Sequence, residues 1–205
     1  MQKITKTTGV SKPRLTTNSL VKISVLSVLS YILMVIDFPL PMFPPFLKLD
    51  FSDIPALLGS FAMGPMAGVL VQLVKVTLHL LTKTQTGGVG ELANFIVGVS
   101  YILPAAIIYH RKKDRNHALI GLIAGTLVMT LAGAVVNKYI TLPFYAAFSS
   151  MDAIVGIGNA VNSKIVDVNT LILYGISPFN ILKGAVIAFV TLPIYKKISP
   201  ILKNN

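Results

Sequence analysis

Residues 118–136 read ALIGLIAGTLVMTLAGAVV, a run of 19 residues without a charged side chain. Residues 92–109 form a second uncharged run, of 18 residues. A helix needs about 20 apolar residues to cross the hydrocarbon core of a bilayer, so each run is long enough to span one. A third apolar run, 178–198, contains Lys183 and ends in Lys196-Lys197; it begins directly after Ser177, and Ser-Pro is a typical helix start. These runs predict an all-α fold of membrane-spanning helices.

The composition of the whole chain supports the same class. Of its 205 residues 54% are hydrophobic and only 12% are charged, with a mean hydropathy of +0.75. Soluble domains carry about a quarter charged residues. The net charge of +11 is compatible with nucleic acid or with a membrane, but the hydropathy excludes a soluble nucleic-acid binder. Because the chain has no cysteine, disulfides and thiolate chemistry are excluded as well.

The number of spans depends on residues 54–81, which are too long for one typical span and short for two. Gly64-Pro65 interrupts this stretch. Positive residues favour the cytoplasmic side, and the main basic segment is HRKKDRNH at 110–117. Two spans place that segment and both basic termini on the cytoplasmic side, so we predict a break at Gly64-Pro65. The predicted spans are 20–37, 53–64, 66–82, 92–109, 118–137 and 178–198. They form one membrane domain (19–198) between cytoplasmic tails (1–18 and 199–205).

Three loops would then face the outside, at 38–52, 83–91 and 138–177. The first contains FPLPMFPPF at 38–46, where four prolines in nine residues prevent a helix. The last is about 40 residues long and still apolar, and such loops are uncommon without a function or a structure of their own. An apolar outer loop suggests either a lid over an apolar ligand or packing on the helix bundle, and the sequence leaves both open.

Polar residues that the topology does not explain gather toward the same face. Lys183 lies about 7–8 Å into the last span at ~1.5 Å per residue, where an ammonium must snorkel, pair or face a polar cavity. We favour the cavity, with Asn137 and Asn180 at a similar depth. Asp50 is a candidate acceptor for a ligand. Asp53, by contrast, fits the first turn of a helix, where an acid complements the helix dipole.

A second polar set lies on the third span. Gln72, Lys75 and His79 follow i, i+3 and i+7 and therefore share one helix face, as a polar interior stripe or a contact surface. Signatures of common enzymes are missing, since the sequence has no Walker A motif, no HExxH and no G-x-S-x-G. We therefore expect no enzyme, no metal and no bound cofactor.

Four segments carry a resemblance to a known family: FPLPMFPPFLKLDFSDIPAL at 38–57, FAMGPMAG at 61–68, GELANF at 90–95 and PFNILKG at 178–184. They resemble the riboflavin-specific substrate-binding (S) component of energy-coupling factor (ECF) vitamin transporters over about residues 20–198. The resemblance implies six helices and a high-affinity vitamin pocket near the outer surface, closed by the loop after the first helix. It also implies a bacterial cell membrane location, a separate transmembrane coupling (T) protein and two cytoplasmic ABC-type ATPases as partners.

The resemblance also implies which residues meet the vitamin. Asn137, Asn180 and Lys183 would bond the polar edge of the isoalloxazine ring, and Asp50 with its loop would meet the ribityl chain. The apolar edge needs apolar walls, for which Phe46, Leu49, Phe51 and residues 144–148 are available. The expected ligand-binding residues are Asn137, Lys183, Asn180, Asp50, Leu49, Lys48, Phe46, Phe51, Asn94 and Gly90.

The expected coupling surface lies on the first helix, where related chains often carry an Ala-x-x-x-Ala pattern. Here Ser24, Ser27 and Ser30 offer small side chains that allow a close helix contact. Three alternatives stay open: FMN in place of riboflavin, an S component for another vitamin, and a membrane-embedded enzyme. A channel is less compatible with the sequence, because the polar residues gather at one end of the predicted bundle.

Overall fold

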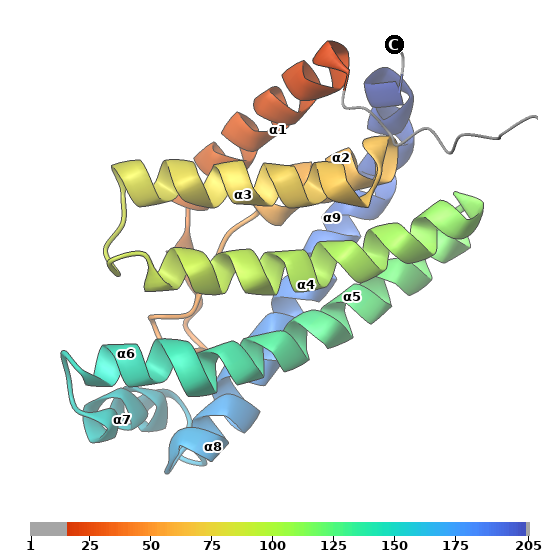
Figure 1. Cartoon of the computed structure of the whole chain (residues 1–205). Coiled ribbons are helices and arrows are strands. Elements are labelled where there is room, and N and C mark those ends of the chain that lie inside the picture. The colour runs from red at the N-terminus through yellow and green to blue at the C-terminus, as the bar shows by residue number, and fades with distance from the viewer. Residues whose placement is uncertain (1–15, 204–205) are drawn as a thin grey trace, which may run out of the picture.

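The computed structural model describes residues 16–203 of the chain, and side chains through residue 198. It is a bundle of helices with one short hairpin between the first two (Figure 1). The elements, in order, are α1 (Thr17–Val35), β1 (Phe38–Pro39), β2 (Lys48–Leu49), α2 (Asp53–Met63), α3 (Pro65–Thr82), α4 (Val89–Lys112), α5 (Arg115–Val136), η1 (Asn137–Thr141), α6 (Leu142–Ala146), α7 (Met151–Val161), α8 (Val168–Leu171), η2 (Ile172–Ile176) and α9 (Ser177–Lys203), where η marks π-helical turns. The all-α class is thus confirmed.

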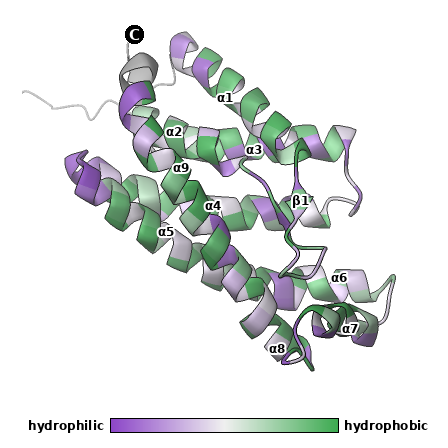
Figure 2. Cartoon of the chain, turned by 180° about the vertical axis from the view of Figure 1, so that it is seen from behind, coloured by the Kyte–Doolittle hydropathy of each residue, from purple (hydrophilic) through white to green (hydrophobic). Residues whose placement is uncertain are grey.

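Five helical stretches within residues 16–203 are long and apolar enough to cross a membrane: Thr17–Val35, Pro65–Thr82, Val89–Lys112, Arg115–Ala146 and Val168–Ile198. Figure 2 shows hydrophobic residues along most of α1 and α5, with hydrophilic residues where α4 and α5 meet at one end. The start of α1 and the end of α9 lie toward that same end (Figure 1). This arrangement is the one that the charge-based topology requires.

The predicted break at Gly64-Pro65 is confirmed, although the helix before it is short. Gly64 has φ +111°, which favours glycine, and Pro65 begins α3. With 11 residues, α2 is roughly 16 Å long, about half a bilayer core. Ten of those residues are buried, so α2 is an interior helix packed between α3 and α9. The six-span count therefore reduces to five long helices and one short buried helix.

The expectation of a long outer loop at 138–177 is wrong. Helix α5 continues through η1 and α6 to Ala146, and α8 continues through η2 into α9. Pro143 lies directly after η1, and the helix continues past it to Ala146. A π-helical turn lies within each of these two long helices, at η1 and at η2, and the sequence pattern does not reveal such turns. Only residues around α7 connect these two long helices.

The hydrophobic core has two parts. The larger lies within the bundle, around Leu57, Phe61, Tyr101 and Leu122. The smaller joins the proline-rich loop to the α6–α9 region through Phe43, Leu47, Leu49, Leu142, Ile154, Ile165, Leu171, Ile176 and Phe179. The residues of the apolar outer segment in this cluster pack on the bundle, which is one of the two roles expected for it, and the lid role stays a prediction. In the β1–β2 hairpin Phe38 pairs with Leu49, and Leu49 packs into this outer core.

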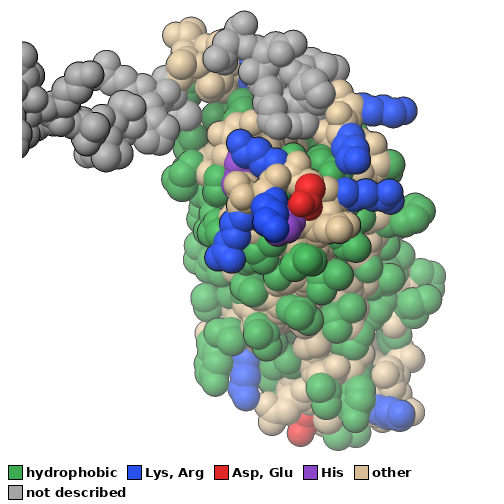
Figure 3. All heavy atoms as spheres, turned by 90° about the vertical axis from the view of Figure 1, so that its right-hand side faces the viewer, with side chains coloured by type: hydrophobic (Ala, Val, Ile, Leu, Met, Phe, Trp, Pro, Cys, Tyr) green, Lys and Arg blue, Asp and Glu red, His purple; other side chains and the backbone are tan. Residues whose placement is uncertain are grey.

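The opposite end of the bundle is basic. Figure 3 looks onto this end and shows Lys and Arg side chains gathered around a single acid, above a hydrophobic belt. At the start of α5, Asp114 caps the helix by accepting from the His117 backbone N–H at 2.7 Å. The backbone and ring N–H groups of His117 hold the pKa of Asp114 below its ordinary value. Its charge is thus committed to the start of α5.

Candidate functional site

A buried cluster of two lysines and two aspartates ties the proline-rich loop to the bundle. Lys183 Nζ on α9 lies 2.8 Å from Asp50 Oδ2 and 3.6 Å from Asp53 Oδ2. Lys75 Nζ on α3 lies 3.3 Å from Asp53 Oδ1 and donates to Ser52 Oγ at 3.0 Å. All four charged side chains are buried. Two positive and two negative charges balance, which is the condition under which buried ions are tolerated.

Two of the sequence interpretations change with this cluster. Asp53 lies in the first turn of α2, as expected, but its carboxylate is buried and bonded to Lys75, Lys183 and Gln72 rather than only facing a helix start. Ser52 makes no side-chain capping bond. Lys183 does not snorkel, because its ammonium is paired in the interior. The polar face of α3 is an interior stripe for Gln72 and Lys75.

A cavity of about 330 Å³ lies beside this cluster, between the proline-rich loop and the α3–α4 connection. Pockets that enclose small organic ligands have about 300–1,000 Å³, so the volume suits one of modest size. Its lining residues are Met34, Asp37, Phe46, Lys48, Asp50, His79, Lys83, Gln85, Thr86, Gly90, Glu91, Asn94 and Tyr145. Asp50 belongs to both the cavity wall and the buried cluster.

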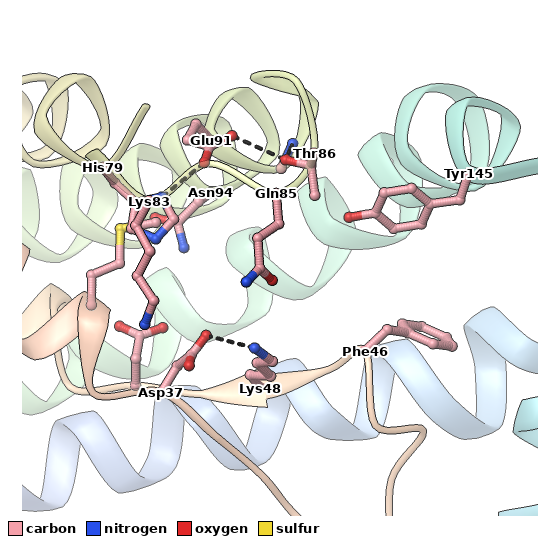
Figure 4. A pocket seen from close by; sticks show the side chains of 13 residues that line it. Asp37, Phe46, Lys48, His79, Lys83, Gln85, Thr86, Glu91, Asn94 and Tyr145 are labelled. Atoms are coloured by element: carbon pink, nitrogen blue, oxygen red, sulfur yellow. Dashed lines mark hydrogen bonds and ion pairs between the residues drawn. The ribbon is translucent and has the colours of Figure 1, made fainter. Parts of the chain in front are cut away.

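Opposite walls of the cavity carry separate polar pairs (Figure 4). On one wall Lys48 Nζ lies 3.3 Å from Asp37 Oδ2. On the other, His79 Nδ1 lies 2.8 Å from Glu91 Oε1, and the Thr86 hydroxyl donates to Glu91 Oε2 at 3.0 Å. The aromatic rings of Phe46 and Tyr145 flank one end (Figure 4). The cavity therefore combines apolar surface with several hydrogen-bonding groups.

One polar atom in the wall has no partner. Asn94 Oδ1 is buried and accepts no hydrogen bond from any described residue. A buried polar atom without a partner costs free energy, and such atoms are rare in folded proteins. A ligand N–H or O–H in the cavity would satisfy it.

Five of the ten predicted ligand-binding residues line this cavity: Phe46, Lys48, Asp50, Gly90 and Asn94. Leu49 is buried in the outer core instead. Phe51 is half-buried and its ring packs against that of Phe38, with centroids 6.4 Å apart. Neither residue is part of the cavity wall.

The remaining three predicted residues form a neighbouring group on α5–η1 and α9. Asn137 donates to the Gly133 carbonyl at 2.8 Å, and Asn180 donates to the Ile176 carbonyl at 3.0 Å. A Cβ on Gly133 would lie 2.5 Å from Asn180 Nδ2, so this glycine lets the two helices bring their amides together. Through the Lys183–Asp50 pair this group adjoins the cavity.

Several lining residues were not identified from the sequence as site residues. His79 and Glu91 meet across the α3–α4 connection, and Lys83 donates to the Val35 carbonyl at the end of α1 at 2.9 Å. One feature of the sequence could have indicated these residues: acidic residues are scarce in this chain, and Asp37 and Glu91 are two of only seven. Their partners lie 11 and 12 residues away, and only the folded connections bring them together.

The predicted coupling surface needs correction. Ser24 is exposed, but Ser27 and Ser30 are fully buried, and Ser30 donates to the Ser52 carbonyl. A spacing of three residues turns the helix by about 300°, so Ser24 and Ser30 lie about 120° apart around α1. The three serines cannot share one face. Ser30 instead helps to hold the start of α2.

Comparison with known proteins agrees with this architecture. The family model for the ECF transporter, substrate-specific component, matches residues 18–195. The riboflavin transporter RibU of Staphylococcus aureus (strain TCH60) is 40% identical over 90% of this chain and 92% of its own length. The riboflavin transporter FmnP of Bacillus subtilis (strain 168) is 34% identical over 91% and 94%.

A solved structure, described as the S component of a bacterial ECF transporter, superposes with a TM-score of 0.71 at 37% identity. It covers 91% of this chain and 98% of that one. The range of the family model, 18–195, includes the loop at 38–52 and all residues that line the cavity. The chain therefore belongs to the family of substrate-specific components of ECF transporters and is a multi-pass membrane protein.

Proposed function

We propose that this protein binds riboflavin at the outer face of the cell membrane and presents it to an ATPase-driven coupling module. The observation that carries the proposal is the mixed apolar and polar cavity of about 330 Å³, one wall of which is formed by the loop at 38–52. Its relatives, named riboflavin transporters, supply the substrate class. In this role the chain is a transport component rather than an enzyme, and riboflavin is cargo rather than a cofactor.

The chemistry of a flavin suits the residues around the cavity. The ring has an apolar dimethylbenzene edge, which Phe46 and Tyr145 would face. Its carbonyl-rich edge needs donors. Lys183 Nζ has three N–H donors, and Asp50 and Asp53 account for two of them. The third is free to bond a flavin carbonyl without breaking the ion pairs.

The side-chain amides of Asn137 and Asn180 each use one N–H on a helix carbonyl. Each therefore keeps a second N–H and its own carbonyl oxygen for a ligand. A flavin pyrimidine edge alternates acceptors and an N–H donor, which an amide can match. We propose that these two amides and Lys183 recognise that edge, while Asp50, Lys48 and Asn94 meet the ribityl hydroxyls.

The coupling partners in this proposal are a transmembrane T protein and two cytoplasmic ATPases. Family membership supports them. Since Ser27 and Ser30 are buried, the contact surface on α1 would be its exposed apolar face instead, which includes Val21, Val25 and Val28.

The test is the absorbance spectrum of the purified protein, followed by quenching of riboflavin fluorescence. We expect bound flavin or nanomolar quenching. Replacing Lys183 or Asn137 by alanine should weaken binding about tenfold or more, since hydrogen bonds to charged or buried groups contribute about 1.5–3 kcal/mol. Lys164→Ala, at an exposed residue that does not line the cavity, is the matched control.

No binding of either riboflavin or FMN would refute the proposal. Tighter binding of a different vitamin in a ligand panel would make the chain an S component of another specificity. Competition between riboflavin and FMN then establishes which flavin is preferred.

A further inference from the structure

A second groove lies at the opposite, basic end of the molecule. It has a volume of about 470 Å³ and is lined by Arg115 on α5 and by Phe189, Leu192, Pro193 and Lys196 on α9. The four α9 residues follow i, i+3, i+4 and i+7, so they form one continuous helix face. The groove therefore runs along α9 and ends between two cations.

The course of the two helices explains why the groove opens there. A Cβ on Gly184 would lie 2.5 Å from the Thr126 hydroxyl, which marks a close approach of α9 to α5. From this point the helices diverge toward the basic end (Figure 1). Arg115 and Lys196 are 11 and 12 residues beyond it, roughly 16–18 Å along each helix. That span is about half the thickness of a bilayer core, or one leaflet.

The floor of the groove is apolar and unusually open. The Phe189 side chain is 80% exposed, although both α5 and α9 belong to candidate membrane spans. In a bilayer such a surface contacts hydrocarbon rather than water. An acyl chain lying along Phe189, Leu192 and Pro193 would cover it.

The end of the groove is positively charged without compensation. Neither Arg115 nor Lys196 forms an ion pair with any residue that the structure describes. The acid nearest in sequence, Asp114, is engaged with His117. Figure 3 shows how few acids this end exposes among its Lys and Arg side chains. An anionic group is the missing complement.

We propose that this groove binds one anionic phospholipid, with its phosphate between Arg115 and Lys196 and an acyl chain along the exposed face of α9. Basic pockets between membrane helices commonly bind anionic headgroups. A protein partner is less suited to this groove than a lipid, because apolar surface and positive charge follow each other along one membrane-facing side of α9. The site is separate from the vitamin cavity and independent of its ligand.

The test measures lipid retention by native mass spectrometry of the full-length protein, titrated with phosphatidylglycerol or phosphatidylcholine. The variant carries Arg115→Gln and Lys196→Gln. Its control carries Lys112→Gln and Lys197→Gln, which remove the same charge from the same end without touching the groove lining. We expect the groove variant to lose affinity for phosphatidylglycerol about tenfold or more. The control should change less than threefold, and binding of phosphatidylcholine should be weak throughout.

A third variant, Phe189→Ser, separates the headgroup from the acyl chain. It should weaken phosphatidylglycerol binding while leaving all charges in place. Inorganic phosphate, titrated in the same measurement, should bind the protein far more weakly than phosphatidylglycerol does. Riboflavin affinity, measured in parallel, should stay unchanged in every variant and shows that each has folded.

Three results would overturn the proposal. Equal losses in the groove variant and its control would mean diffuse attraction between a basic end and anionic lipid. Inorganic phosphate binding as tightly as phosphatidylglycerol would mean an anion site without a lipid. Unchanged lipid retention, with weaker association to the coupling protein, would mean a protein-docking surface.

Discussion

Lys183 is the residue at which the proline-rich loop, α2 and α9 meet. Its ammonium holds Asp50 from the loop and Asp53 from α2, although Asp50 lies 133 residues away in sequence. The sequence predicted that Lys183 and Asp50 belong to one site, but as separate contacts to a ligand. The direct ion pair between them was not predictable, because a contact to the ligand already explained the presence of each residue by itself.

Removing Lys183 should therefore cost stability as well as affinity. We expect Lys183→Met to destabilise the protein by about 3–5 kcal/mol, because the buried Asp50 carboxylate loses its ion-pair partner and Asp53 keeps only Lys75. Adding Asp50→Asn to it should recover part of that loss. Lys48→Met is the control, since its pair with Asp37 is partly exposed and contributes about 1 kcal/mol or less. Thermal unfolding of the ligand-free protein measures all four proteins, and an equal loss in Lys48→Met would contradict this account.

Asn94 should show the opposite relation between stability and binding. Its Oδ1 is buried without a partner, so Asn94→Leu removes an unsatisfied atom and should leave the ligand-free unfolding temperature unchanged or higher. Riboflavin affinity should fall by about tenfold. Unfolding temperatures with and without riboflavin test both parts, and a variant that is less stable but binds normally would assign Asn94 a structural role only.

At the scale of elements, α4 and α5 pack through small residues. Gly121 and Gly125 form a G-x-x-x-G pattern that faces α4, and a Cβ on Gly125 would lie 2.4 Å from the Tyr101 carbonyl oxygen. Tyr101 in turn donates from its hydroxyl to the Gly184 carbonyl of α9 at 3.0 Å. This contact links three long helices at one level.

We expect Gly125→Val to lower the unfolding temperature strongly, because the added side chain would push α4 and α5 apart. Gly156→Ala in α7 is the control, since a Cβ there meets nothing within 4 Å. Thermal unfolding in detergent compares the two. Similar unfolding temperatures for both variants would show that the helices can separate at little cost.

The elements that the sequence predicted well are those with a local cause. Long apolar runs, two of them without any charge, identified the long helices, and Gly64-Pro65 identified the end of α2 because glycine and proline act on the backbone directly. The π-helical turns η1 and η2 were missed, since no residue type in the sequence marks such turns. Both overlap residues 138–177, which were expected to form a loop and are largely helical.

At the scale of the whole molecule, charge asymmetry predicts its orientation. The chain has no cysteine, so single-cysteine variants can be labelled without background. In intact cells a membrane-impermeant maleimide should label Ser163→Cys, near the end of α7, but not Asn116→Cys at the basic end. Both should react after the cells are permeabilised. The reverse pattern would place the vitamin cavity on the cytoplasmic side.

The candidate site was partly predictable at this scale. The loop at 38–52 and the α4 start were located correctly as cavity walls, because their prolines, glycines and acids have no place in a plain span. The opposite wall, with His79, Lys83 and Tyr145, was missed as a binding surface. Those residues reach the cavity only through the hairpin-like return of α3 into α4 and the continuation of α5 into α6.

The ion pair between Lys183 and Asp50 also bears on how long a captured vitamin remains. Moving the loop away from α9 would separate two buried opposite charges in a medium of low dielectric, which is costly. Because the pair is formed in the ligand-free protein, this step slows both entry and exit of the ligand, so exchange of a captured ligand should be slow. Because buried charges are poorly screened, the residence time should change little with salt concentration.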